Sequence, residues 1–277
     1  MKRQITFWVI LLCLVMAAMP AMTVCAAADD KPPVLTPPPT PVPVELEDMP
    51  EEEIWWTDMK PFRIGDFMVI IREGTIEISE YCGTDAGVVV PKEIEGLPVT
   101  AIWPEAFMSS GGTVVSVEVQ AELTSIDEAF SCCQSLEAVT LPATLKTIGL
   151  DAFLGCHSLV SICIPDSVTA IEQEAFSNCD HLETVKLPEG INVIDDYTFW
   201  GCSSLTAINI PASVSSIGEE AFWGCSSLPS ISIPAGVTSI AGNAFQGCDS
   251  LVIHVVSGSY AEAYCRENGM NYRVISE

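Results

Sequence analysis

The chain has 277 residues, of which 37 are Asp or Glu and 11 are Lys or Arg, giving a formal net charge of −26 at pH 7. A chain this acidic lacks the basic surface needed to bind nucleic acid or an anionic membrane, so we expect neither partner. Hydrophobic residues make up 49% of the sequence and aromatic residues 8%, which excludes a wholly disordered protein. The length suffices for one or two ordinary domains.

Residues 1–28 have the composition of a signal peptide. A basic pair, Lys2 and Arg3, precedes an apolar stretch at 5–19, and the alanines at 26–28 fit a cleavage site. The alternative is an uncleaved membrane anchor, because the apolar stretch with its alanines is long enough to span a bilayer. No second apolar run of this length follows. We therefore expect an exported protein, extracellular or at the cell surface, whose mature domain is not embedded in the membrane.

Residues 29–60 are rich in proline and acidic side chains. Runs such as Pro37-Pro38-Pro39 favour extended polyproline II, and nine acidic residues lie between Asp29 and Asp58. We interpret this segment as a semi-rigid, self-repelling linker.

The remainder of the chain repeats every 23 residues. Phenylalanine occurs seven times at this interval, six times after Ala, and a Cys follows three residues later in six copies. Leu and Pro recur in the same register. A sustained period of this length predicts a solenoid, here of about seven coils over residues 96–256. The phenylalanines are Phe107, Phe130, Phe153, Phe176, Phe199, Phe222 and Phe245, and the cysteines are Cys133, Cys156, Cys179, Cys202, Cys225 and Cys248.

A single repeat shows how each coil is built. Ile162 and Ile164 lie on one face of a short strand, which Pro165 ends because it has no N–H to donate. Further on, the segment from Glu174 to Phe176 predicts a tight helical turn. Stacked coils bury like residues on like and pair their strands in parallel. The expected fold class is a mostly β, or α/β-type, solenoid of parallel strands and short helical turns.

The register shifts once within the repeats. Between Phe107 and Phe130 the chain gains one residue around Gly111-Gly112 and loses one within 125–129, so the overall period survives. We expect a local change of loop in an early coil.

Both ends of a solenoid need caps. The N-terminal cap at 61–95 contains a predicted hairpin with strands at 67–71 and 75–78, followed by a first array strand at 88–90. The C-terminal cap at 257–277 begins with a capping box, Ser259 and Glu262. It continues as a helix to Asn268, which Gly269 ends, and as a closing strand at 271–275.

These residues resemble the BspA-type leucine-rich repeats of bacterial surface proteins. The motif Ile-x-Ile-Pro-x-x-Val-x-x-Ile-x-x-x-Ala-Phe-x-x-Cys-x-x-Leu is complete from Ile208 to Leu228, and the resemblance extends over about residues 62–275. It implies a leucine-rich repeat fold and a secreted or cell-surface protein that binds other macromolecules, in some members as an adhesin. It implies no catalytic residues, because the motif describes scaffold positions only.

The cysteines of the repeat predict a column of buried thiols rather than disulfides. Neighbouring coils place equivalent atoms about 4.8 Å apart with parallel side chains, whereas a disulfide needs convergent Cβ atoms about 3.8 Å apart. Cys163 points away from the core and is the expected accessible thiol. The redox state of Cys163, and of the other irregular cysteines Cys82, Cys132 and Cys265, stays open. No C-x-x-C pair is present, so we expect no metal and no other cofactor.

Acidic residues recur two positions before the phenylalanine, as Glu105, Glu128, Asp151, Glu174 and Glu220. They could form a calcium-binding column, but no Asp-x-Asp-Gly loop accompanies them. The favoured interpretation is a carboxylate at the N-terminus of each helical turn. His157, His181 and His254 occupy three different repeat positions with no shared Asp or Ser register. We therefore expect no enzyme.

The position directly after each phenylalanine is the best candidate for a binding surface. Trp200 and Trp223 occupy it in consecutive coils and should stack side by side, while Leu154 and Met108 occupy it in earlier coils. Exposed tryptophans suit contacts with protein or carbohydrate. The alternative is that each ring covers its own turn and shields the core.

The predicted function is therefore recognition of a macromolecule by a secreted or cell-surface module, with adhesion as one form. Its partner would be an extracellular protein or glycan. The alternative is a spacer or scaffold of a larger surface assembly that binds no partner of its own.

Overall fold

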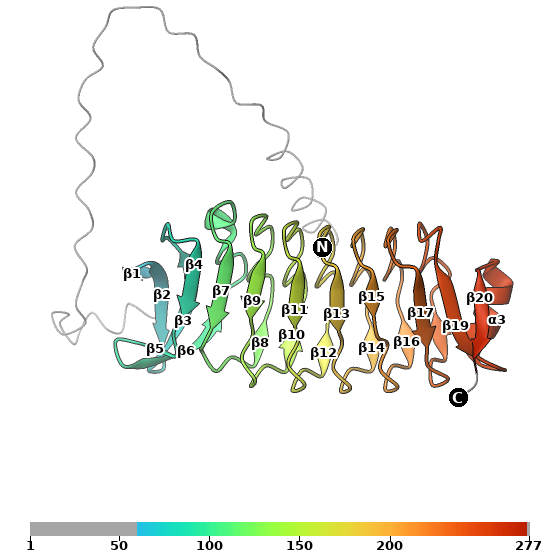
Figure 1. Cartoon of the computed structure of the whole chain (residues 1–277). Coiled ribbons are helices and arrows are strands. Elements are labelled where there is room, and N and C mark those ends of the chain that lie inside the picture. Colours follow the sequence, from blue (N-terminus) through green and yellow to red (C-terminus); the bar gives the residue numbers. More distant parts are fainter. Residues whose placement is uncertain (1–59, 276–277) are drawn as a thin grey trace, which may run out of the picture. The chain divides into compact units, whose positions relative to one another are not determined.

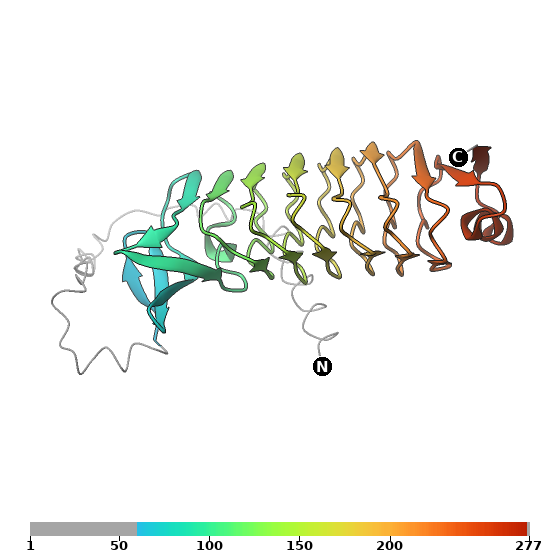
Figure 2. The same ribbon diagram turned by 90° about the horizontal axis from the view of Figure 1, so that it is seen from below.

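The computed structural model describes residues 60–275. The predicted signal peptide at 1–28 and the predicted linker, except for its last residue, lie outside the described residues, as do the last two residues of the chain. The described part is an elongated solenoid whose coils follow one another along a single axis (Figures 1 and 2). Its fold is the parallel-strand solenoid expected from the 23-residue period.

One long face of the solenoid is a series of parallel strands. Equivalent residues of successive coils pair directly, as Ile162 does with Val185 and Val185 with Ile208. The hydrogen-bonded ladders come in three groups of three. They are β4 (Gly87–Val90), β7 (Ser116–Val119) and β9 (Ala138–Thr140), then β11 (Ser161–Cys163), β13 (Thr184–Lys186) and β15 (Ala207–Ile208), then β17 (Ser230–Ile233), β19 (Val252–Val256) and β20 (Tyr272–Ile275).

A second series of very short strands runs along another face of the same coils (Figure 2). These strands pair in parallel and contribute inward-facing isoleucines such as Ile148, which pairs with Ile171. They are β8 (Ser125–Ile126), β10 (Thr147–Ile148) and β12 (Ala170–Ile171), then β14 (Val193–Ile194), β16 (Ser216–Ile217) and β18 (Ser239–Ile240).

The pairing register confirms the shift read from the sequence. Ser116 pairs with Ala138 and Ser125 with Thr147, so both steps span 22 residues although the phenylalanines remain 23 apart. The residue gained in the early coil lies next to η3 (Met108–Ser110), a short 3-10 helix. The change of loop is thus confined to one coil. The strand pairs β7–β9 and β8–β10 both keep their parallel alignment.

The core contains one continuous column of aromatic rings. Neighbouring phenylalanine centroids lie 5.1–5.6 Å apart, and the rings of Phe153 and Phe176 are inclined by only 2°. Tyr81 of the N-terminal cap stacks on Phe107 at 5.5 Å. Tyr264 of the C-terminal cap meets Phe245 edge-on at 6.3 Å. Each cap therefore extends the column by one aromatic ring.

The turn that carries each phenylalanine is not helical, contrary to expectation. The residue two positions before the phenylalanine is left-handed in six coils, with φ between 50° and 59°, and only η3 and the C-terminal helix are helices within residues 60–275. In a typical turn the carbonyl of Asp151 accepts a hydrogen bond from the N–H of Leu154 at 3.1 Å. The left-handed residue thus begins a tight turn, where the sequence suggested a helix N-terminus.

The caps have the predicted elements. At the N-terminal end, β2 (Phe67–Arg72) and β3 (Thr75–Tyr81) form the antiparallel hairpin. They join a five-stranded sheet with β1 (Phe62–Ile64), β5 (Glu93–Ile94) and β6 (Leu97–Ile102). At the other end, α3 (Tyr260–Asn268) is N-capped by the Ser259 side chain, which accepts from the Glu262 N–H at 3.2 Å, and ends at left-handed Gly269.

The described coils number about nine rather than seven, because β4 and β20 each belong to a coil without a core phenylalanine. Among residues 60–275, no helix combines the length and the apolarity needed to cross a bilayer.

Candidate functional site

The turns that carry the phenylalanines lie along one edge of the solenoid, here called the turn edge. It comprises, in each coil, the residue two positions before the phenylalanine and the two residues after it. Directly after the phenylalanines come Met108, Ser131, Leu154, Ser177, Trp200, Trp223 and Gln246. Each coil contributes one residue to this position. A continuous binding surface along the edge therefore needs chemically similar side chains in neighbouring coils.

Trp200 and Trp223 form such a feature. Their indole rings stack with centroids 4.9 Å apart and an interplanar angle of 12°, and both residues remain partly exposed. Trp103, in contrast, donates its indole N–H to Glu77 at 2.9 Å. No hydrogen bond to another described residue engages the indole N–H of Trp200 or Trp223. The pair therefore presents apolar ring surface together with two indole N–H groups that could donate hydrogen bonds to a ligand.

The other two candidates of the turn edge do not join this pair. Leu154 is only 2% exposed, so the prediction that it forms part of an exposed surface is wrong. A branched aliphatic side chain at this position gains more by packing on its own turn than by facing water. Met108 is partly exposed but lies in η3, at the N-terminal end of the repeats and several coils from Trp200.

The neighbours of the tryptophan pair are polar or lack a side chain. Asn243 donates a hydrogen bond from its amide to a carboxylate oxygen of Glu220 at 3.3 Å, and Gln246 is exposed. Gly201, Gly224 and Gly247 directly follow Trp200, Trp223 and Gln246 in the sequence. Their φ angles lie between 73° and 80°, a left-handed conformation that favours glycine. We call these three residues the glycine strip. A Cβ on Gly247 would lie 3.2 Å from the backbone nitrogen of Gly224, so the strip is closely packed.

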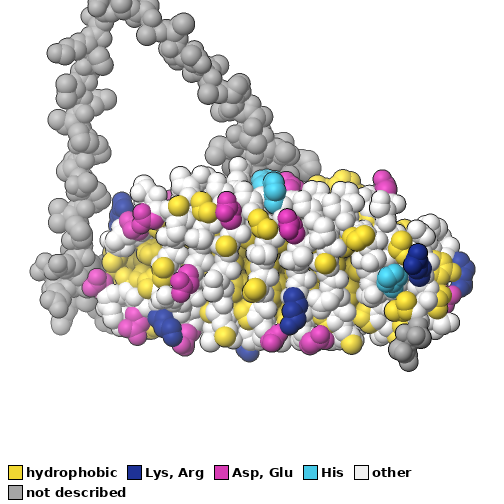
Figure 3. All heavy atoms as spheres, viewed as in Figure 1, with side chains coloured by type: hydrophobic (Ala, Val, Ile, Leu, Met, Phe, Trp, Pro, Cys, Tyr) yellow, Lys and Arg dark blue, Asp and Glu magenta, His cyan; other side chains and the backbone are white. Residues whose placement is uncertain are grey.

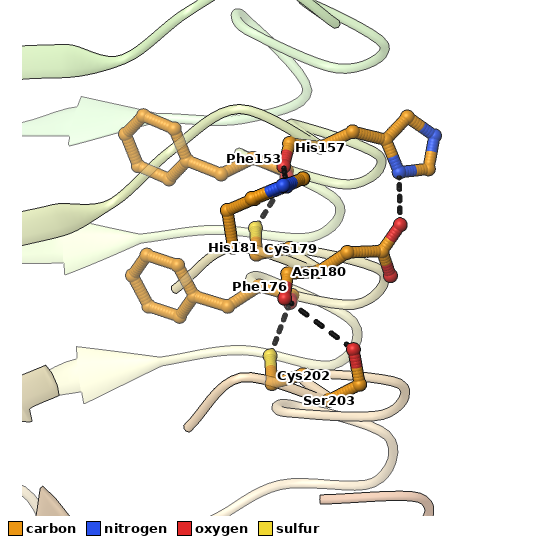
Figure 4. A network of polar contacts seen from close by, with 8 residues as sticks. All are labelled: Phe153, His157, Phe176, Cys179, Asp180, His181, Cys202 and Ser203. Carbon is orange, nitrogen blue, oxygen red and sulfur yellow. Dashed lines mark hydrogen bonds and ion pairs between the residues drawn. The ribbon is translucent and has the colours of Figure 1, made fainter. Parts of the chain in front are cut away.

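The repeated cysteines form the predicted thiol column. In five consecutive coils the thiol donates a hydrogen bond to the carbonyl of the phenylalanine in the preceding coil, at Sγ–O distances of 3.0–3.3 Å. Figure 4 shows two of these bonds, from Cys179 and Cys202. Burial raises the pKa of the Cys133 thiol to about 12 and keeps that thiol neutral, whereas a hydrogen bond with Cys225 lowers the pKa of Cys248 at the C-terminal end of the column. All six thiols are free.

The acidic column also lies on the turn edge, but it does not cap helices. Asp151 is 5% exposed, and its Oδ1 has no hydrogen-bond partner among the described residues. Burial, with the neighbouring carboxylates of Glu174 and Glu128, raises the pKa of Asp151 to about 8. No group of three His, Cys, Asp or Glu residues within 60–275 is arranged to hold a metal ion. The arrangement therefore does not support a calcium column.

The statement that His157 shares no register with an aspartate is wrong. Asp180 occupies the same position in the next coil, and His157 Nδ1 lies 2.8 Å from Asp180 Oδ2 (Figure 4). His181 Nδ1 donates to the carbonyl of His157 at 2.6 Å. The neighbouring Cys156 thiol donates to Phe130 and so does not meet the imidazole. This contact is a hydrogen-bonded pair between coils and supplies no nucleophile.

The exposed side of the strand face is bland. Its outward residues in register include Cys163, Lys186, Ser232, His254 and Arg273, and the intervening column is made of small residues such as Ser161 and Ala207. Figure 3 shows isolated charged side chains on this face with uncharged surface between them. Cys163 is exposed, as predicted, and its thiol, whose redox state the sequence left open, is free. The face offers no concentrated chemistry comparable with the tryptophan pair.

Comparison with known proteins agrees with the geometry of the coils. Residues 124–252 match the description "BspA type Leucine rich repeat region" in six copies. The repeat region belongs to the BspA-type leucine-rich repeat family. The matched residues include the phenylalanines from Phe130 to Phe245 and all six cysteines of the thiol column.

Two solved structures are similar over a larger share of the chain. A leucine-rich cell surface protein from Faecalibacterium prausnitzii is 35% identical with a TM-score of 0.64, over 71% of this chain and 54% of that protein. A leucine-rich repeat protein of T. pallidum is 29% identical with a TM-score of 0.52, over 79% of this chain and 100% of that protein. The chain therefore spans about half the length of the F. prausnitzii protein. No curated protein matches it.

Sequence reasoning located the tryptophan pair but missed two features of the BspA-type repeats. The pairing of His157 with Asp180 could have been found by aligning the residue four positions after each phenylalanine. The glycine strip could have been found in the same way, two positions after the phenylalanine. Both patterns are present in the sequence, but at positions that the repeat motif leaves unspecified.

Proposed function

We propose that this BspA-type repeat region is an extracellular recognition module that binds another macromolecule through the turn edge around Trp200 and Trp223. One observation carries the proposal: two partly exposed indole rings stack at 4.9 Å in consecutive coils. Tryptophan is enriched among residues that dominate binding energy, because it supplies large apolar area and a polar N–H. The description of the F. prausnitzii relative as a cell surface protein supports placing this module outside the cell.

The rigidity of the coils supports this use. The tryptophans sit on turns whose backbones are hydrogen-bonded to the next coil, as in the bond from the Gly201 N–H to the Trp223 carbonyl at 2.7 Å. A side chain held by a rigid backbone loses less conformational entropy on binding. The turn edge is therefore a pre-organised surface.

A second candidate function is that of a spacer, favoured by the small, uncharged side chains of the strand face. A spacer would hold other parts of an assembly apart and bind no partner through its repeats. The two functions differ in whether the turn edge has a saturable ligand.

The test is binding of the purified full-length chain to immobilised extracellular matrix proteins, mucins and cell-wall polysaccharides. We expect saturable binding to at least one of them, lost in the double variant Trp200→Ala, Trp223→Ala. Trp103→Ala is the control, since it removes an exposed tryptophan that directly follows β6 and lies outside the turn edge. Unaltered circular dichroism verifies the fold of each variant. Absence of saturable binding to every class would support the spacer instead.

A further inference from the structure

We propose that the ligand of the turn edge at Trp200 and Trp223 is a neutral oligosaccharide. This inference rests on the proposed recognition function and adds the chemical class of the partner. It follows from what surrounds the two rings: amides and hydroxyls, a strip of backbone without side chains, and no cationic residue.

The rings supply the apolar part of such a site. The two indoles stack face to face at 4.9 Å and both residues remain partly exposed, so part of each ring is open to a ligand. A sugar ring has an apolar face of C–H groups that packs on an aromatic ring, and hydroxyls at its rim that need hydrogen-bond partners. Within residues 60–275 no side chain or carbonyl engages the two indole N–H groups, which can therefore serve those hydroxyls.

The neighbouring side chains are of the type that pairs with sugar hydroxyls. Gln246 is exposed directly after the pair in the same column, and Asn178 lies beside it, since a Cβ on Gly201 would meet Asn178 Oδ1 at 2.8 Å. Amides both donate and accept hydrogen bonds, as hydroxyls do. The partly exposed Ser203 and the exposed Ser226 follow the first two glycines of the strip at an interval of two residues.

The glycine strip leaves the backbone beside the tryptophans uncovered. Gly201, Gly224 and Gly247 are all at least partly exposed, and a Cβ added to Gly224 would lie 3.8 Å from the Cα of Gly201. A larger residue would strain the left-handed backbone, and at Gly247 its Cβ would also crowd the backbone of Gly224. Glycine is a regular choice where a ligand approaches the backbone closely.

The charge of these coils excludes anionic ligands. Between Lys186 and Arg266 there is no Lys or Arg, whereas seven Asp or Glu residues lie in the same stretch. Glu220 is part of the turn edge itself, hydrogen-bonded to Asn243. A sulfated or sialylated glycan would meet uncompensated repulsion, so the ligand is neutral.

The distribution of apolar surface disfavours a protein ligand at this edge. A stable protein interface buries about 800 Å² per partner around an apolar core. The large hydrophobic residues classed as exposed in the described region are Val89, Trp103, Val160, Val193, Tyr260, Val274 and Ile275, none of which belongs to the turn edge. Two rings among polar neighbours suit a sugar better than a protein.

The test is a calorimetric titration of the full-length chain with neutral hexasaccharides. The hexasaccharides are those of glucose, N-acetylglucosamine, mannose and xylose. We expect binding of at least one, weakened about tenfold or more by Trp223→Ala, as for a dominant binding residue. Gln246→Ala should weaken it less, and the control Trp103→Ala should leave it unchanged. A sialylated and a sulfated hexasaccharide should not bind.

The other outcomes overturn the inference in distinguishable ways. Protein ligands that bind through Trp200 and Trp223, without any neutral glycan, would refute the glycan inference and leave the recognition function standing. Glycan binding that survives Trp200→Ala with Trp223→Ala would place the site elsewhere and refute the inference. Failure of proteins and glycans alike would refute both proposals.

Discussion

The thiol of Cys179 donates a hydrogen bond to the carbonyl oxygen of Phe153 in the preceding coil, at an Sγ–O distance of 3.3 Å. That carbonyl already accepts the backbone N–H of Cys156 at 3.2 Å, so the thiol uses its second lone pair. In the irregular early coil Ser110 takes the place of the cysteine, and its hydroxyl donates to Phe107 within the same turn. The thiol column is thus a set of specific polar bonds inside an apolar core.

Replacing one member of this column should destabilise the solenoid moderately. Cys179→Ala removes a buried sulfur and its hydrogen bond, and we expect a loss of about 1–2 kcal/mol in the free energy of unfolding. Urea denaturation measures it. Cys163→Ala is the matched control, because Cys163 is exposed and its loss should change the unfolding free energy by less than about 0.5 kcal/mol. Equal effects of the two substitutions would contradict the account.

Thiol-reactive reagents should distinguish the same two classes of cysteine. Burial raises the pKa of the Cys133 thiol to about 12 and of the Cys202 thiol far above its ordinary value, so neither carries a thiolate near neutral pH. We expect iodoacetamide to label Cys163 in the native protein, and Cys133 and Cys202 of the column only after denaturation. Peptide mass spectrometry reports the site. Native labelling of the column at the rate of Cys163 would show that the coils open.

The aromatic column predicts a large effect for a central phenylalanine. Phe176 is fully buried, with ring centroids 5.4 Å from Phe153 and 5.6 Å from Phe199. Phe176→Ala should cost about 3–5 kcal/mol in the free energy of unfolding, because it leaves a cavity that two rigid coils cannot close. Phe176→Leu should cost about 1–2 kcal/mol, since most of the volume is kept. Urea unfolding monitored by circular dichroism measures both free-energy changes. A negligible loss of unfolding free energy in Phe176→Ala would refute the stacked core.

Asp151 should make stability fall as pH rises. Burial first, and the carboxylates of Glu174 and Glu128 next, raise its pKa in the folded protein from 3.8 to about 8. Between these two values the folded state binds more protons than the unfolded state, so this contribution to stability is complete below about pH 4 and is lost as pH approaches 8. Asp151→Asn should therefore gain stability over the wild type as pH rises, on the order of 5 kcal/mol at pH 8.

Chemical denaturation between pH 4 and pH 9 measures this difference. Glu105→Gln is the control, because Glu105 occupies the same repeat position but is exposed, and its substitution should change stability little at any pH. A constant difference between wild type and Asp151→Asn across the range would show that Asp151 titrates as in the unfolded chain.

The ion pair of His157 and Asp180 should contribute little. Their side chains are 40% and 45% exposed, so water and salt screen the 2.8 Å contact. We expect His157→Ala to lower the free energy of unfolding by less than about 1 kcal/mol at pH 6. Equilibrium unfolding checks it, and a much larger loss would mean that the pair aligns the coils.

Much of the fold could be inferred from the residues alone. Phe153 and Phe176, or Cys156 and Cys179, are 23 residues apart, and a repeat stacks equivalent residues because each coil can bury its apolar side only against the next. The caps were also accessible, since Ser259 and Gly269 follow local rules for helix ends that need no distant contact.

The features that escaped such reasoning depend on how neighbouring coils meet. A glutamate or aspartate has no strong preference for the left-handed conformation, yet the turn imposes it at Asp151 because hydrogen bonds to both sides over-determine the backbone. Leu154 and Trp200 occupy the same repeat position, but one is buried and the other is partly exposed. The period specifies which residues stack, whereas the three-dimensional packing of side chains across coils sets which of them reach water or a partner.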